Sequence, residues 1–344
     1  MVLLIDKWRG RIQLLSHTQN SVVYAVDTDD GVGEGRANET ATVLKGWAVW
    51  YRGEEPLGPL RPPDIADWIV RREAAIYEQV GRHDLIVNYL GLEVAVLRGA
   101  GPEPKAWAIR LERAPGKALR SYLRGPAPSE RARLDLCLQF ARAVAHVHSR
   151  GVVWGDLSTR NALVFSCPTP NPRGGAAGRS SDAAASQASS SSSTAPPSSQ
   201  QSASSPSAPW RIKLCDFGTA ALFENYDKDY WGAEVRYTPP GPSAHLDKRG
   251  DIKDVGIIHR ELFALGSAIC EITEWTVPYG PEHEVTYEEV QAMLLAGEWP
   301  DISLDNPAED IIRRCWDYQY VAASEIVEDL ESIISQSTAP QQDG

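Results

Sequence analysis

The chain has 344 residues, of which 42% are hydrophobic, and it carries a formal net charge of −12 with an isoelectric point near 5.1. The acidic balance argues against broad nucleic-acid binding, which needs a basic face, and no apolar run approaches the roughly 20 residues of a membrane span. Five widely spaced cysteines without a C-x-x-C motif indicate reduced thiols rather than a disulfide framework or a zinc site, so we expect an intracellular protein of the cytoplasm or nucleus.

Two β-rich segments open the chain. Residues 10–16 and 21–28 are predicted strands, and the turn between them is rich in small polar residues. A third β-rich run, residues 40–45, ends in Lys45. Taken alone, this lysine is better explained as an ordinary surface residue. Only its predicted partner on the next helix favours a buried, functional lysine.

That partner lies on a predicted helix that Pro63 and Asp64 open, with apolar residues at positions 65, 69, 76 and 80. Glu73 falls on the same apolar stripe, and a buried carboxylate without a partner is costly. Lys45 is the candidate partner, with Arg71 and Arg72 as competitors.

Apolar and polar residues alternate in part through residues 106–112, which predicts a strand. Pro115 and Gly116 follow it and are a plausible break between two modules. Ser129 is the expected N-cap of the next helix, and residues 152–153 form a short strand after it. The predicted buried face of this helix comprises Leu134, Cys137, Ala141, Val144 and Val147.

Two motifs downstream carry the chemistry. Residues 154–161 read W-G-D-L-S-T-R-N, and residues 216–218 read D-F-G. Phosphoryl transfer from Mg·ATP needs a carboxylate that orients the attacking hydroxyl and accepts its proton, which Asp156 would supply. It also needs oxygen ligands for magnesium, which Asp216 and Asn161 would supply. The simpler alternative is that Asp156 and Asn161 only cap a turn.

Residues 167–209, between these motifs, are mostly Ser, Ala, Pro, Gly and Gln, with no aromatic residue and no Leu, Ile or Val. Such a run cannot bury enough surface to order itself, so we predict a disordered insert. It is either a phosphorylation or docking segment or a tolerated insertion without function. Beyond it, residues 262–272 predict a helix buried nearly all round, and residues 311–316 and 324–330 predict two closing amphipathic helices.

Residues 154–161 and 216–218 resemble the catalytic loop and D-F-G segment of protein kinases, whose patterns are H-R-D-L-x-x-x-N and D-F-G. Residues 75–91 closely resemble the small kinase-domain proteins of filamentous fungi. The resemblance runs from about residue 10 to 335, apart from the insert. It implies an α+β, bilobal protein kinase-like fold. Residues 1–114 would form a small β-rich N-lobe with one long helix, residues 115–335 a larger, mainly helical C-lobe, and residues 336–344 a tail.

The resemblance also implies a set of site residues. Asp156 would be the base, Lys45 and Glu73 the ion pair of an active kinase, and Arg160 a contact for the γ-phosphate. Leu111 would be the gatekeeper of the nucleotide pocket. Binding of ATP and Mg²⁺ is expected from Ser16, Val23, Lys45, Leu111, Glu112, Ala114, Asn161 and Asp216, with the metal itself held by Asn161 and Asp216.

The nucleotide-covering turn and the catalytic loop depart from the kinase pattern. Ser16, Thr18 and Ser21 stand at the three glycine positions of the turn, so close backbone approach to the phosphates is less certain. Trp154 and Gly155 replace the His and Arg of the catalytic loop, and Ser158 replaces a Lys.

Further departures lie in the larger predicted lobe. Gly241 replaces a Glu, which would leave its usual partner, Arg313 or Arg314, orphaned, and Glu261 stands where Asp is usual. Together, Gly155 and Gly241 imply that phosphorylation of the predicted activation segment has little control over activity, because the Arg that would bind the phosphate is replaced by Gly155.

Three functions are therefore weighed. An active protein kinase would use ATP, Mg²⁺ and a protein substrate, with serine or threonine preferred as acceptor and tyrosine open. A pseudokinase would act as a nucleotide-binding or scaffolding module, and tight Mg·ATP binding without transfer would favour it. A small-molecule phosphotransferase of kinase-like fold also often has G-D-x-x-x-x-N in its catalytic loop, but the D-F-G triplet and the closing helices favour a protein substrate.

Overall fold

The computed structural model describes residues 11–17, 21–26, 42–46, 62–96, 102–167, 209–225, 234–240, 256–281 and 283–337. Several predictions fall outside these ranges: Thr18, Gly241, residues 168–208 of the expected insert, and residues 338–344 of the expected tail.

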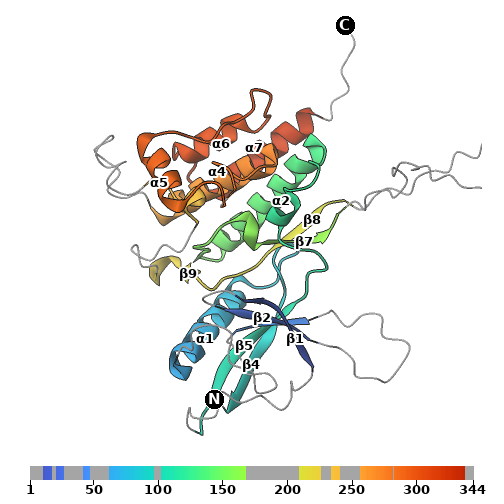
Figure 1. Ribbon diagram of the computed structural model, residues 1–344, viewed down its shortest axis with the longest axis vertical. Coiled ribbons are helices and arrows are strands. Elements are labelled where there is room, and N and C mark those ends of the chain that lie inside the picture. Colours follow the sequence, from blue (N-terminus) through green and yellow to red (C-terminus); the bar gives the residue numbers. More distant parts are fainter. Residues whose placement is uncertain are drawn as a thin grey trace, which may run out of the picture.

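The N-terminal part is built on an antiparallel sheet, which has five strands in the order β1-β2-β3-β5-β4 within the described residues. These strands are β1 (Ile12–His17), β2 (Val22–Val26), β3 (Thr42–Gly46), β4 (Tyr89–Val96) and β5 (Pro104–Glu112). Helix α1 (Pro63–Val80) packs on β4 and β5 and lies beside the sheet in the lower half of Figure 1.

The buried face of helix α1 matches the predicted one over Glu73, Ile76, Tyr77 and Val80, but not over its first turns. Ile65 is 45% exposed and Trp68 is 61% exposed. The guanidinium of Arg72 lies over the ring of Trp68. The buried positions are Ala66, Val70, Glu73, Ala74, Ile76, Tyr77 and Val80. The buried stripe therefore starts one position after Ile65, at Ala66. Glu73 keeps its predicted place on the buried face.

The C-terminal part is mainly helical and occupies the upper half of Figure 1. Its helices are α2 (Glu130–Ser149), α4 (Ile257–Glu274), α5 (Tyr287–Ala296), α6 (Glu309–Trp316) and α7 (Ala323–Gln336). Two short strand pairs, β6 (Val152–Val153) with β9 (Ala221–Leu222) and β7 (Ala162–Ser166) with β8 (Arg211–Leu214), lie between this part and the sheet. Its 3₁₀ segments are η2 (Leu119–Tyr122), η3 (Thr159–Asn161), η4 (Phe223–Asn225) and η5 (Val235–Tyr237).

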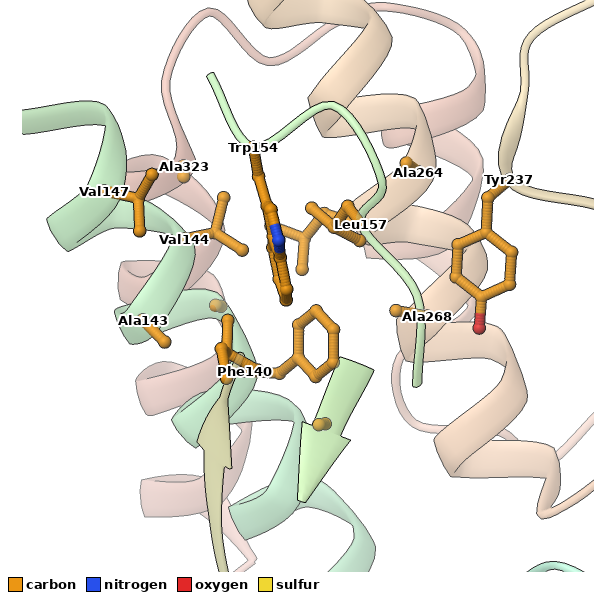
Figure 2. Close-up of a cluster of buried hydrophobic side chains, with 14 of the residues drawn as sticks. Phe140, Ala143, Val144, Val147, Trp154, Leu157, Tyr237, Ala264, Ala268 and Ala323 are labelled. Carbon is orange, nitrogen blue, oxygen red and sulfur yellow. The ribbon is translucent and has the colours of Figure 1, made fainter. Parts of the chain in front are cut away.

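Helices α2 and α4 form the centre of the C-terminal core. Ser129 caps α2 by accepting a hydrogen bond from the Ala132 amide at 3.3 Å, and all five residues of the predicted α2 face are buried. Residues 261–273 of α4 are buried on every side. Figure 2 shows side chains of both helices meeting Trp154 and Leu157 from the loop after β6. The expected α+β fold is therefore confirmed, whereas the boundary at residues 114 and 115 stays a prediction.

The strands β7 and β8 explain how the chain accommodates a long insertion. They pair directly, with Ala162 opposite Leu214 and Ser166 opposite Arg211, and the Ser166 hydroxyl donates to the Pro209 carbonyl at 2.6 Å. The two ends of the predicted insert therefore lie next to each other, and loop closure costs grow only slowly with the length between such ends.

One prediction about the C-terminal helices is wrong. Neither Arg313 nor Arg314 is orphaned: Arg313 binds Glu309 at 2.8 Å, and Arg314 binds Asp329 at 2.6 Å. The guanidinium of Arg314 also lies over the ring of Tyr320, 4.1 Å from its centroid. Helices α6 and α7 supply these partners locally, so neither arginine depends on a carboxylate at position 241.

Candidate active site

Lys45 of β3 lies between two carboxylates. Its Nζ is 2.6 Å from Glu73 Oε1 on α1 and 2.6 Å from Asp216 Oδ1, which follows β8. Both Lys45 and Glu73 are buried. The competing arginines are engaged elsewhere, because Arg71 binds Asp67 at 2.9 Å and Arg72 donates to the backbone carbonyl of Ala220. The structure thus brings together three of the predicted residues from three distant segments.

The charges in this cluster hold Lys45 as a cation. Burial alone would lower the pKa of Lys45, but the negative charges of Asp216 and Glu73 outweigh it and raise the pKa above its ordinary value. Burial opposes ionisation of Asp216 too, yet Lys45 holds the pKa of this carboxyl below its ordinary value. For Glu73, burial is the larger influence and raises the pKa, although Lys45 opposes the shift.

Asp156 and Asn161 form a second pair on the loop between β6 and β7. The Asn161 amide donates to the Asp156 backbone carbonyl at 2.8 Å and to its carboxylate Oδ2 at 3.0 Å. The other carboxylate oxygen, Oδ1, is buried and has no hydrogen-bond partner among the described residues. A buried carboxylate oxygen without a partner is unfavourable for folding and therefore points to a functional role.

The environment of Asp156 makes it a weaker acid than a free carboxyl. Burial, with smaller contributions from Asp216 and Glu234, raises the pKa of Asp156 from its ordinary value of 3.8 to about 6, while Asn161 and Arg160 oppose the shift. A base with this pKa is still mostly ionised at neutral pH, and it holds a proton more readily than a solvated carboxylate does.

Asn161 and Asp216 are joined through the backbone. The amide of Cys215 donates to the Asn161 carbonyl at 2.9 Å, which places the end of β8 beside the catalytic loop. Asp216 itself has a backbone φ of 67°, in the left-handed region that residues other than glycine rarely adopt. The two predicted metal ligands therefore flank the same end of the β7–β8 pair, Asn161 directly before β7 and Asp216 shortly after β8.

Two departures from the kinase pattern, Gly155 and Glu261, both help to fix the conformation of the loop between β6 and β7. Glu261 of α4 is only 1% exposed, and its carboxylate accepts the backbone amides of Trp154 at 2.8 Å and Gly155 at 2.7 Å. Gly155 has a φ of 82°, and a Cβ there would lie 2.8 Å from the Thr219 carbonyl oxygen. A larger residue at 155 would therefore push the catalytic loop away from the segment after D-F-G.

Replacing Glu261 with leucine should destabilise the protein, because it leaves two buried backbone amides without an acceptor. Each unsatisfied donor costs about 1–3 kcal/mol, so the free energy of unfolding should fall by about 2–6 kcal/mol in chemical denaturation. Glu328→Leu, on an exposed position of α7, is the matched control and should leave the unfolding curve nearly unchanged. Equal curves for wild type and Glu261→Leu would contradict this role.

Arg120 of η2 is a site residue that sequence reasoning missed. Its guanidinium binds Glu234 at 2.7 and 2.8 Å and Glu271 at 2.7 and 2.9 Å. The Tyr237 hydroxyl donates to Glu271 at 2.7 Å, and Arg160 Nε lies 3.3 Å from Glu234. This buried network ties the segment around Glu234 to the catalytic loop. Arg120 is 114 residues from Glu234 and 151 residues from Glu271, so no local motif could have revealed the network.

The predicted adenine-contact strand ends at Leu111 and Glu112, both buried. The side chain of Glu112 accepts from the Asn88 amide at 3.0 Å and from the Asn88 side chain at 2.8 Å, and it also pairs with Lys213 of β8. Glu112 therefore links the sheet to the C-terminal part through its side chain, a role the sequence did not suggest. Ala114 follows it at a half-buried position.

The predicted nucleotide-covering residues Ser16 and Val23 lie on β1 and β2, the two strands on the far side of β3 from β5. Val23 of β2 pairs directly with Lys45 of β3, so the two share one end of the sheet. Ser16 pairs with Val23 and is exposed on β1.

The match to known proteins covers most of this architecture. The family model described as protein tyrosine and serine/threonine kinase matches residues 66–326, from α1 to α7, a span that includes Glu73, Asp156, Asn161 and Asp216. No curated protein matches the chain significantly. Among the described residues, none of the helices has the length and apolar character that crossing a membrane requires.

Proposed function

The chain belongs to the protein tyrosine and serine/threonine kinase family, and on this premise we propose that it transfers the γ-phosphate of Mg·ATP to a hydroxyl of a protein substrate. The observation that carries the proposal is the contact of one buried lysine, Lys45, with both Glu73 and Asp216 at 2.6 Å. One carboxylate balances the charge of a buried lysine, so the second gives this cluster a net negative charge that suits a metal ion bound together with phosphates.

In the proposed reaction, Asp156 accepts the proton of the substrate hydroxyl as that oxygen attacks the γ-phosphorus. Its unpartnered Oδ1 is the atom available for this proton, because Oδ2 already accepts from Asn161. Lys45 binds the α- and β-phosphates, with Glu73 keeping its ammonium in place. Arg160, whose side chain is 41% exposed, contacts the γ-phosphate as negative charge develops there.

The donor set fits magnesium. Asp216 and Asn161 would hold the ion, which when bound neutralises phosphate charge and stabilises the leaving group. Mg²⁺ is usually bound by one or two carboxylates together with substrate phosphates rather than by an all-protein cage. Consistent with this, no cluster of three His, Cys, Asp or Glu side chains that could hold a metal ion occurs among the residues that the structure describes.

The rest of the nucleotide site is proposed on family grounds. Ser16 and Val23 would cover the phosphates, Leu111 would close the back of the pocket, and the backbone of Glu112 and Ala114 would bind adenine. The amide of Glu112 already donates to the Asn88 carbonyl at 3.0 Å, so its carbonyl is the group we assign to adenine.

The pH dependence of the reaction follows from the pKa of Asp156. This group acts as a base only when ionised, and its pKa is raised to about 6, so kcat/KM should be high at neutral pH and fall as pH drops through about 6. Because the positive charge of Arg160 lowers this pKa, Arg160→Gln should move the midpoint to higher pH, whatever it does to the maximal rate. A rate that stays flat down to about pH 5 would contradict the assignment of the base.

The test is incubation of the purified chain with γ-labelled ATP, Mg²⁺ and a degenerate peptide library, followed by identification of the labelled amino acid. We propose serine or threonine as the acceptor, and label on tyrosine alone would overturn that choice. Tight Mg·ATP binding without label would favour a scaffolding pseudokinase. Label found on small-molecule acceptors but on no peptide or protein would favour a small-molecule phosphotransferase.

A further inference from the structure

A polar cavity of about 230 Å³ lies in the C-terminal part and shares no residue with the candidate active site. Its walls come from the start of α2, the end of α4 and the loop between α5 and α6, elements that Figure 1 places in the helical half of the protein. Pockets for drug-sized ligands typically measure about 300–1,000 Å³, so this cavity suits a smaller molecule.

Three charged side chains that line this cavity are left without a partner. Among the described residues, no hydrogen bond or ion pair engages the side chain of Arg133, Glu130 or Asp305, although their charges are opposite. The Nε of Arg133 is itself buried and has no acceptor there. Buried donors are almost always hydrogen-bonded, so this one points to an acceptor that comes from outside the chain.

The fourth charged residue of the cavity, Glu274, is already used to fix the loop before α6. Its carboxylate accepts the Ser303 amide at 2.9 Å, the Ser303 hydroxyl at 2.6 Å and the Asn306 side-chain amide. Burial alone would raise the pKa of Glu274, but these hydrogen bonds, helped by the charge of Arg133, lower it. The loop that carries Asp305 is therefore held in place, and Glu130 and Asp305 supply the carboxylates that a ligand can use.

We propose that this cavity binds a free basic amino acid, such as arginine. The ligand's α-carboxylate pairs with Arg133, whose planar guanidinium suits bidentate contact with a carboxylate. Glu130 lies three residues before Arg133 on α2, so the two are neighbours on the helix surface and match the adjacent ammonium and carboxylate of an amino acid. The side-chain cation of the ligand pairs with Asp305 on the loop. Three carboxylates against one guanidinium disfavour an anionic ligand.

The experiment is calorimetric titration of the full chain with L-arginine and with three analogues that each lack one charged group. Agmatine lacks the carboxylate, Nα-acetyl-arginine lacks the ammonium, and citrulline lacks the side-chain charge. L-Arginine should bind saturably, and each analogue about 10–100-fold more weakly, the typical contribution of one charged hydrogen-bonded pair. Absence of binding up to about 10 mM L-arginine, or agmatine binding as tightly as L-arginine, would overturn the inference.

Two variants assign the contacts. Arg133→Gln should weaken L-arginine by about 10–100-fold without weakening agmatine, and Asp305→Asn should weaken L-arginine without weakening citrulline. Arg142→Gln is the matched control, because it makes the same change on α2 at an exposed ion pair with Glu331, outside the cavity, and should keep the wild-type affinity. Equal L-arginine affinity in wild type and Arg133→Gln, or an equal loss in Arg142→Gln, would contradict the assignment.

The comparison of analogues uses the wild type alone, so it decides the question even where a variant fails to fold. Binding is measured without nucleotide or acceptor, and the cavity shares no residue with the candidate active site. The inference therefore does not rest on the proposed kinase activity, and a failure of either one leaves the other standing.

Discussion

Replacing Asp156 with asparagine should lower turnover by roughly 10²–10⁴ while leaving nucleotide affinity near the wild-type value. The amide cannot accept the proton of the attacking hydroxyl. It can still accept the hydrogen bond that Asn161 gives to Oδ2, and the bond from Asn161 to the Asp156 backbone carbonyl is unaffected. The fold and the metal-binding residues should therefore remain in place. The measurement pairs steady-state turnover with calorimetric titration of Mg·ATP.

Asp135→Asn is the control for this change. Asp135 is a half-buried residue of α2 that forms an i, i+4 ion pair with Arg131, away from the site. Its replacement makes the same chemical change outside the site and should leave both turnover and nucleotide affinity at wild-type values. A loss of Mg·ATP affinity in Asp156→Asn as large as its loss of turnover would show that Asp156 binds nucleotide or metal rather than acting as the base.

Replacing Lys45 with methionine should reduce turnover by about 10²–10³-fold, the typical effect of losing one preorganised electrostatic contact to the reacting groups. Methionine keeps much of the length and apolar stem of lysine but carries no charge. The change also breaks a buried ion pair and leaves Glu73 without its cation, which typically costs about 3–5 kcal/mol of folding stability. Turnover, Mg·ATP affinity and the free energy of unfolding should all be measured.

The loss of stability in Lys45→Met should depend on pH. Burial raises the pKa of Glu73, and Lys45 is the largest influence that opposes this. Without Lys45 the folded-state pKa rises further, so the folded protein favours the protonated carboxyl and loses stability as pH increases above the unfolded-state value. The deficit relative to wild type should therefore be larger at alkaline than at acidic pH.

Lys105→Met tests whether these effects belong to the cluster at Lys45. Lys105 of β5 forms an ion pair with Asp64, a residue at the exposed start of α1, and its loss should leave turnover unchanged. An unchanged rate in Lys45→Met would remove Lys45 from the site altogether. A stability deficit that grows toward acidic pH would contradict the proposed relation between Lys45 and Glu73.

The site residues that could be predicted are those that short motifs mark. Asp156 and Asn161 are five positions apart on one loop, and Asp216 precedes Phe-Gly, so the resemblance of these two motifs to the kinase pattern placed the three residues together. Lys45 and Glu73 could be paired because a carboxylate on an apolar helix stripe requires a cation, and the structure brings the two within 2.6 Å. Their chemical roles stay predictions until they are measured.

Other features depended on the folded arrangement. The network of Arg120, Glu234 and Glu271 joins residues 114 and 151 positions apart, so no sequence pattern distinguishes these charges from solvated ones. Trp154 stood out in the sequence only as a departure from the usual histidine. A sequence cannot show that its indole N–H donates to the backbone carbonyl of Asp216. Helix α5 was not predicted, since it buries only Val290 and Leu294 and so shows almost no periodic pattern.

The exposed face of α1 was misread for a related reason. Ile65 and Trp68 are strongly apolar, but the helix buries the smaller Ala66 and Ala74 instead. Helical spacing decides the burial of these residues: Ala66, Val70 and Ala74 follow one another at four-residue intervals and so share the face that packs on the sheet, whatever their size. The direction of Glu73 was still correct, because it lies within the overlap of the predicted and observed faces.

The measurement that tests the account most directly is a single-turnover assay with the purified chain, γ-labelled ATP and Mg²⁺, in which label on a protein or peptide acceptor is followed over time. The account predicts label transfer by the wild type, loss of transfer when Mg²⁺ is chelated, and a decrease of roughly 10²–10⁴ in Asp156→Asn. Transfer at the same rate by wild type and Asp156→Asn would contradict the proposed site. No transfer by a folded wild type that binds Mg·ATP would contradict the proposed kinase activity.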